Sequence, residues 1–121
     1  AAEHIVTIAH WSPRPEWKGS QEFEQDYIRK FGQEPDYLNS ALAWVSLQIL
    51  EAAVSRNGLD KEKIRQFVSS ETFDTINGKV KFDGVQNVIT PTAFVQIQQQ
   101  GIKLVWPKSI ANGTYVPKSG W

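Results

Sequence analysis

The segment from Ser40 to Ser55 constrains the fold of this chain more than any other part of the sequence. It is rich in alanine and leucine, and only Ser46, Gln48 and Glu51 interrupt its apolar character. A helix that is apolar almost all round is a buried helix, because each apolar face must be covered by another element. We therefore expect a helix that packs on a sheet and needs cover on nearly every side.

The residues before this segment predict a strand, a connector and a helix. Residues 4–9 form a short segment rich in β-branched side chains, which is typical of a strand. Prolines in residues 10–17 force an extended path, in which we expect two exposed or half-buried tryptophans. Ser20 is expected to cap a helix that ends near Gly32. The apolar residues of this helix form one stripe: Phe23, Tyr27, Ile28 and Phe31.

The residues after it predict a shorter helix, capped by Asp60, and then strands. Residues 93–99 and 102–106 are typical of a hairpin, with Gln96 and Gln98 alternating against the buried positions. Residues beyond Pro107 are expected to form a loop. This order of elements predicts an α/β fold with few strands. Part of the core is therefore expected to belong to sequence outside this chain.

Composition excludes several classes of protein. The 121 residues suggest one domain or a piece of a larger protein. Thirteen basic residues balance thirteen acidic ones, so the charge does not favour nucleic acid or anionic lipid as a partner. The absence of cysteine excludes disulfides, thiolate zinc sites and a cysteine nucleophile. Methionine is absent even at position 1, so we expect a processed or excised product, although no signal-peptide pattern opens the chain.

No catalytic or metal-binding constellation is visible in the sequence. It has no glycine-rich phosphate loop and no nucleophile elbow. The two histidines, His4 and His10, would lie roughly 20 Å apart on a straight strand and could not share a metal. We predict no catalytic residue, no metal, no cofactor and no enzymatic activity.

Tryptophan is the residue type that points to a ligand. Trp44 lies near the start of the apolar helix and is either a core residue or a platform for a ligand. Trp11 lies where a strand gives way to the connector, a position that often borders a ligand crevice in α/β folds. Trp17, Trp106 and Trp121 fit packing or surface roles better.

A series of short motifs gives the chain a resemblance to a known family. The motifs are Trp11-Ser12-Pro13, the stretch from Phe23 to Asp36, Leu50-Glu51-Ala52-Ala53-Val54, the stretch from Thr72 to Gly78, Val80-Lys81-Phe82-Asp83, the Gln96 to Gly101 strand pair and Val105-Trp106-Pro107. Together they resemble the C-terminal third of type I periplasmic solute-binding proteins of ABC importers, in the branched-chain amino acid branch. The resemblance covers essentially all 121 residues.

This resemblance implies a two-lobed fold. Members have two three-layer α/β/α lobes, joined by three crossover strands, which close on a small ligand. By the resemblance, residues 4–10 and 93–121 would belong to the second lobe and residues 18–90 to the first. The remaining N-terminal part of the same protein would supply most of each sheet.

The resemblance also implies a ligand site. Trp44 falls where branched-chain amino acid binders carry an aromatic residue, often tyrosine, against the ligand. Tryptophan offers a larger face and an indole N–H but no acceptor, so aromatic or other larger carboxylates become plausible ligands. Trp11 and His10 are the next residues expected to line the cleft.

The function implied is that of the extracytoplasmic solute-binding component of an ABC importer, which captures a small amino acid or carboxylate between hinged lobes. Its partners would be the ligand, the membrane permease and the remaining N-terminal part, with no nucleic acid. Its location would be periplasmic or extracellular. Two alternatives are a ligand-sensing domain of a receptor or regulator with the same fold, and a small interaction domain that folds alone.

Overall fold

The computed structural model describes residues 2–14, 16–36, 38–90, 92–99 and 101–120. The fold is mixed α/β, as the sequence predicts, and the chain divides into two compact units. One unit comprises residues 1–10 and 92–121, and the other comprises residues 11–91. Trp121 lies outside the described residues, so its expected role stays a prediction.

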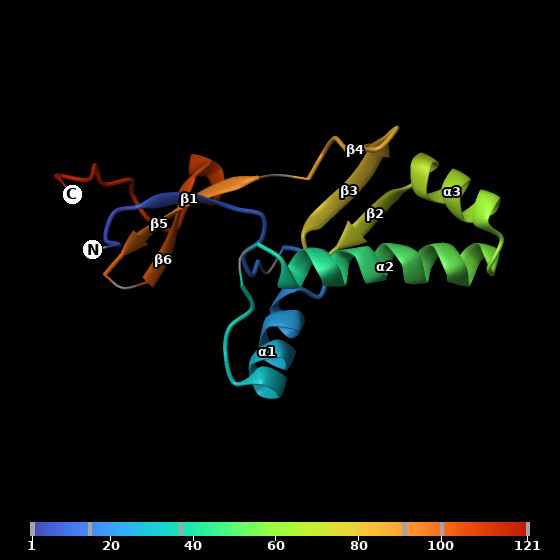
Figure 1. The fold of residues 1–121 in the computed structure, drawn as a ribbon, viewed down its shortest axis with the longest axis horizontal. Coiled ribbons are helices and arrows are strands. Elements are labelled where there is room, and N and C mark those ends of the chain that lie inside the picture. The colour runs from blue at the N-terminus through green and yellow to red at the C-terminus, as the bar shows by residue number, and fades with distance from the viewer. Residues whose placement is uncertain (1, 15, 37, 91, 100, 121) are drawn as a thin grey trace. The chain divides into compact units, whose positions relative to one another are not determined.

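The first unit is built on an antiparallel sheet of three strands in the order β1-β5-β6. The strands are β1 (Val6–Ala9), β5 (Ala93–Gln98) and β6 (Gly101–Trp106), and a short 3₁₀ helix, η1 (Lys108–Ile110), follows (Figure 1). Strand β1 is shorter than the predicted strand, since it begins at Val6. The predicted hairpin is confirmed as β5 and β6.

The two faces of this sheet differ from the simple alternation that the sequence predicts. Val95 and Leu104 are buried, but Gln96 is buried as well and has no exposed surface. The expectation of an exposed polar face is therefore wrong at Gln96, because the segment after β6 lies over this position and bonds to it.

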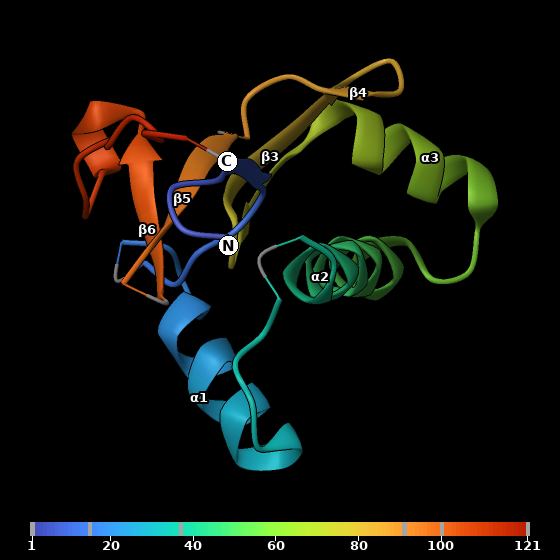
Figure 2. The same ribbon diagram turned by 60° about the vertical axis from the view of Figure 1, so that its left-hand side comes forward.

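The second unit contains three helices and an antiparallel sheet in the order β2-β3-β4. Its elements are α1 (Ser20–Phe31), α2 (Ser40–Asn57), α3 (Lys61–Ser70), β2 (Thr72–Thr75), β3 (Gly78–Asp83) and β4 (Gln86–Asn87). Figures 1 and 2 show α3 and the β2–β3 hairpin on the same side of α2. Helix α2 is thus covered on one side by the rest of its unit.

The apolar helix is confirmed as α2, but only one of its faces is buried. Its buried residues recur every four positions: Ala41, Val45, Ile49 and Ala53. The opposite side carries Leu47, Leu50 and Val54, of which Leu47 and Leu50 are exposed. The expected burial on nearly every side is therefore not met within this chain, because no described element of the second unit covers that face.

One predicted helix cap is confirmed and another is wrong. Asp60 caps α3, since its Oδ1 accepts hydrogen bonds from the backbone N–H groups of Glu62 and Lys63. Ser20, by contrast, is the first residue inside α1, and Gly19 takes the cap position. The Ser20 hydroxyl is buried and accepts a hydrogen bond from the backbone N–H of Arg14 at 3.1 Å, so it holds the connector instead.

Helix α2 is capped by Asp36, a residue that precedes the helix. The Asp36 carboxylate accepts hydrogen bonds from the hydroxyl of Ser40 and from the backbone N–H groups of Leu38, Asn39 and Ser40. The Ser40 hydroxyl, followed by the backbone donors, holds the pKa of Asp36 at about 2, below its ordinary value of 3.8. The ionised carboxylate also interacts favourably with the positive end of the helix dipole.

Replacing Asp36 by alanine is expected to lower the free energy of unfolding at pH 7 by about 1 kcal/mol, the usual cost of a lost cap. The pKa of Asp36 is lower in the folded chain, so its stabilisation is present above about pH 4 and is lost as the pH falls through about 2. Urea unfolding of both proteins between pH 7 and pH 2 tests this expectation. Asp26→Ala, which removes only an exposed ion pair with Arg29, is the control. A stability gap that stays constant with pH would contradict the assignment.

Candidate functional site

An apolar groove lies between α1 and α2 and contains Trp44. Its volume is about 660 Å³. The side of α1 is formed by residues spaced four apart, which a helix places on one face. The apolar and aromatic lining is Phe23, Tyr27 and Phe31 from α1 and Ala43, Trp44 and Leu47 from α2.

The aromatic rings of the groove form a continuous series. The ring centroids of Phe23 and Trp44 are 5.7 Å apart, and the two planes are inclined by 35°. Phe23 also contacts Tyr27 at 5.8 Å, and Tyr27 contacts Phe31 at 4.5 Å. Trp44 is packed on one side only, since 47% of its surface is exposed. The groove therefore offers flat aromatic surfaces, which suit a planar or branched apolar group.

Polar groups lie along the groove in small number. The hydroxyl oxygens of Tyr27 and Ser40 are 3.3 Å apart, and Tyr27 donates in this hydrogen bond because the single Ser40 proton is donated to Asp36. The side-chain amide of Gln48 already makes one hydrogen bond, because its Oε1 accepts from the backbone N–H of Ile76 at 3.2 Å. Glu22, Asp26 and Lys30 also line the groove. An apolar lining with a few polar groups is the usual composition of a small-molecule site.

Trp11 is a core residue in this structure. Only 3% of its surface is exposed, which corrects the expectation that it is exposed or half-buried. Its indole N–H donates a hydrogen bond to the backbone carbonyl of Ile76 at 3.0 Å. Its ring meets Phe23 edge-on, with centroids 5.5 Å apart. Trp11 and Trp44 thus both contact Phe23, and Trp11 can influence the groove through that ring.

His10 is half-buried and directly follows β1. It is the last residue of the N-terminal segment, residues 1–10, that belongs to the first unit. Trp44 belongs to the other unit. Its predicted contribution to a cleft stays a prediction.

The described parts of the chain contain no cluster of three or more histidine, cysteine, aspartate or glutamate residues that could hold a metal ion. Among these same residues, no helix has the length and apolar character needed to cross a membrane. The chemistry that the groove supports is contact with an apolar or aromatic group.

Sequence reasoning placed Phe23, Tyr27 and Phe31 on one stripe but did not assign that stripe to a site. The spacing alone could not decide this, because the same stripe would serve equally well in a core. The available signal was the aromatic content of the stripe together with Trp44 on the neighbouring helix.

Comparison with known proteins identifies the fold. No model of a known protein family matches the sequence. A leucine-binding protein, LivK, of Thermotoga maritima matches with a TM-score of 0.72 and 23% identity, over 86% of this chain and 30% of its own. An ABC transporter substrate-binding protein of Desulfitobacterium hafniense, in complex with leucine, matches with a TM-score of 0.74 and 16% identity, over 86% of this chain and 32% of its own. The chain has part of the type I periplasmic binding fold.

A third structure of this fold agrees. The solute-binding protein of an ABC transporter from R. palustris, in complex with benzoate, matches with a TM-score of 0.71 and 17% identity, over 96% of this chain and 31% of its own. The fold implied by the sequence motifs is therefore confirmed. The chain spans about a third of the length of these type I periplasmic binding structures.

Proposed function

We propose that this chain is one part of the extracytoplasmic solute-binding protein of an ABC importer. The whole protein would capture a small amino acid or carboxylate between two hinged lobes, in the periplasm or outside the cell. The observation that carries the proposal is the fold, which the chain shares with three transporter solute-binding proteins over 86–96% of its residues. The activity is binding and not turnover.

The two compact units would belong to different lobes. Residues 11–91 would form part of the first lobe, and residues 1–10 with 92–121 would form part of the second. The chain passes between the units twice, next to His10 and next to Thr92, and these passages would be two of the crossovers. Ligand binding would shift the population toward the closed arrangement, which the membrane permease recognises.

The remaining N-terminal part of the same protein is the partner that the chain lacks. One open apolar face on each unit supports the proposal that the chain packs against this part. On α2 this face contains Leu47 and Leu50, and both are exposed. On the three-stranded sheet, cross-strand pairing aligns Ile8, Phe94 and Trp106 in one exposed row. Apolar faces of this kind normally receive a further layer of secondary structure.

Trp44 is the residue proposed to contact the ligand. Its exposed indole supplies a face for stacking and an N–H donor, but no acceptor. These properties suit an amino acid with a large side chain or an aromatic carboxylate. Trp11 would support this surface through Phe23, and His10 would approach the ligand from the connector.

Replacing Trp44 by alanine in the whole two-lobed protein is expected to weaken binding roughly ten- to a hundredfold, because an aromatic contact and its buried area are lost. Titration calorimetry with leucine and with benzoate measures the effect on whichever of the two the unchanged protein binds.

Two variants control this experiment. Trp44→Phe keeps a ring face and is expected to lose less affinity than Trp44→Ala. Leu59→Ala changes an 84% exposed side chain and is expected to leave the affinity unchanged. Unchanged affinity in Trp44→Ala would remove Trp44 from the ligand site.

A further inference from the structure

We propose that residues 112–118, here called the strap, lock the three-stranded sheet and hold the two ends of the chain together, and that Gln96 is the residue that fastens the strap. The inference is independent of the proposed function. The strap lies in the segment expected to be a simple loop, and it contains no helix or strand. Its hydrogen bonds nevertheless reach β6, β5 and the turn that leads into β1.

The strap begins at the outer edge of the sheet, on β6. The backbone N–H groups of Asn112 and Gly113 both donate to the carbonyl of Leu104 at 3.0 Å. In return, the backbone N–H of Leu104 donates to Oδ1 of Asn112 at 2.7 Å. An edge strand has unpaired backbone groups, and these bonds satisfy both groups of Leu104.

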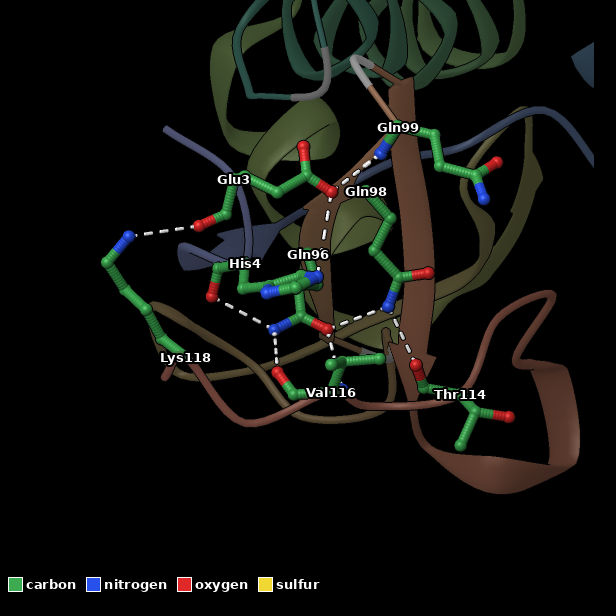
Figure 3. Close-up of polar contacts among 8 residues, drawn as sticks. All are labelled: Glu3, His4, Gln96, Gln98, Gln99, Thr114, Val116 and Lys118. Carbon is green, nitrogen blue, oxygen red and sulfur yellow. Dashed lines mark hydrogen bonds and ion pairs between the residues drawn. The ribbon is translucent and has the colours of Figure 1, made fainter. Parts of the chain in front are cut away.

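The strap then crosses β5, where two side-chain amides bind it. The Nε2 of Gln98 donates to the carbonyl of Thr114 at 2.7 Å. Gln96 binds the next position but one, because its Oε1 accepts from the N–H of Val116 at 2.9 Å and its Nε2 donates to the carbonyl of Val116 at 2.7 Å. Gln96 thus pairs with Val116 through both backbone groups, as a neighbouring strand would (Figure 3).

The strap ends at the residues that lead into β1. The Nε2 of Gln96 also donates to the carbonyl of His4 at 2.9 Å. The Nζ of Lys118 donates to the carbonyl of Glu3 at 3.1 Å. One buried amide therefore joins positions 4 and 116 of the sequence.

The saturation of the Gln96 amide explains why this residue controls the strap. Its oxygen accepts from Val116 and Gln98, and its nitrogen donates to His4 and Val116. A buried amide that makes all these bonds is stable, whereas a residue that removes them leaves buried backbone groups unsatisfied. No apolar residue can replace it without releasing the strap.

The strap approaches β6 closely at Gly113, which allows a second, independent test. A Cβ atom at this position would lie 2.7 Å from the Cβ of Lys103 on β6. The Lys103 Cβ is fixed to the backbone and cannot move aside, so Gly113→Ala is expected to push the strap away from the sheet. Gly120→Ala is the matched control, since a Cβ atom there would meet nothing within 4 Å.

Amide hydrogen exchange of the protein that contains these 121 residues, measured by NMR, tests the proposal. In Gln96→Leu and in Gly113→Ala, the Val116 amide is expected to exchange roughly tenfold faster or more. Gln99→Glu is the matched control for position 96, because the side chain of Gln99 points away from this network (Figure 3). The indole N–H of Trp11, in the other unit, is expected to keep its exchange rate in every variant.

Gln96→Glu gives a readout that a simple packing role would not produce. The new carboxylate keeps acceptors for Val116 and Gln98 but turns an oxygen toward the carbonyls of His4 and Val116. At neutral pH these oxygens repel each other, and at low pH the protonated acid can donate to one of them. The exchange of Val116, relative to the unchanged protein at the same pH, is therefore expected to slow as the pH falls.

Three results would overturn the proposal. One is a Val116 amide that exchanges at the rate of an unfolded chain in the unchanged protein. Another is a Val116 rate that neither Gln96→Leu nor Gly113→Ala alters. The third is an exchange rate of the Trp11 indole N–H that increases as much as that of the Val116 amide. The strap would then have no local role in its own unit.

Discussion

Replacing Trp11 by alanine is expected to lower the free energy of unfolding of residues 11–91 by about 3–5 kcal/mol, the range for deleting a fully buried tryptophan. The core cluster around Trp11 also contains Ile49, Phe73, Ile76 and Val80, so removal of the indole leaves a cavity among these side chains. The variant also leaves the buried carbonyl of Ile76 without the indole donor. Urea unfolding followed by far-ultraviolet circular dichroism measures the loss.

Trp11→Phe separates the two contributions at this position. It keeps a ring in the core but removes the N–H that bonds to Ile76, so we expect an intermediate loss of about 1–3 kcal/mol. Trp17, a half-buried neighbour, provides the comparison for removal of an indole that is less deeply packed. A loss below about 1 kcal/mol in Trp11→Ala would contradict the assignment of Trp11 to the core.

Gly78→Ala is also expected to be strongly damaging, with a loss of about 2–5 kcal/mol from two causes. The first is the left-handed backbone at φ 76°, which costs a residue with a Cβ about 1–2 kcal/mol. The second is a contact of 2.9 Å between the new Cβ and Nε1 of Trp17, which adds overpacking of about 1–3 kcal/mol. Trp17 cannot move freely, because the guanidinium of Arg14 lies 4.9 Å from its ring centroid.

Comparison of Gly78→Ala with Gly84→Ala isolates the second cause, the contact with Trp17. Gly84 has a similar backbone, with φ 59°, but a Cβ there would meet nothing within 4 Å. We therefore expect Gly84→Ala to show only the backbone penalty, and Gly78→Ala to unfold at a clearly lower urea concentration. Equal midpoints for the two variants would show that the ring of Trp17 does not press on the turn at Gly78.

Local patterns in the sequence predicted most of the secondary structure, because each depends on residues close together in the chain. The apolar stripe and Gly32 defined α1, and Asp60 defined the start of α3. Ser20 failed as a cap because its hydroxyl is used by Arg14, a contact that helix-start preferences do not contain. The burial of Gln96 was missed for the same kind of reason, since the group that covers it is twenty residues later in the chain.

The candidate site was less predictable than the fold. Trp44 was singled out from its place on the apolar helix, and the structure places it in a groove with Phe23. Trp11, unlike Trp44, is buried. Its burial involves a hydrogen bond to the carbonyl of Ile76, which is far away in the sequence, so the connector sequence alone could not predict it. The motif order predicted the fold because it combines many weak local signals along the whole chain.

The proposed place of this chain within a two-lobed solute-binding protein is tested most directly by native mass spectrometry. The protein is isolated from its own cells and measured under gentle and then harsh activation. We expect residues 1–121 within a polypeptide or complex of roughly three times 13.7 kDa, because the chain spans 30–32% of its structural relatives, and we expect a small carboxylate or amino acid to be released on activation. A compact species of 13.7 kDa that carries no companion and no ligand would contradict the claim.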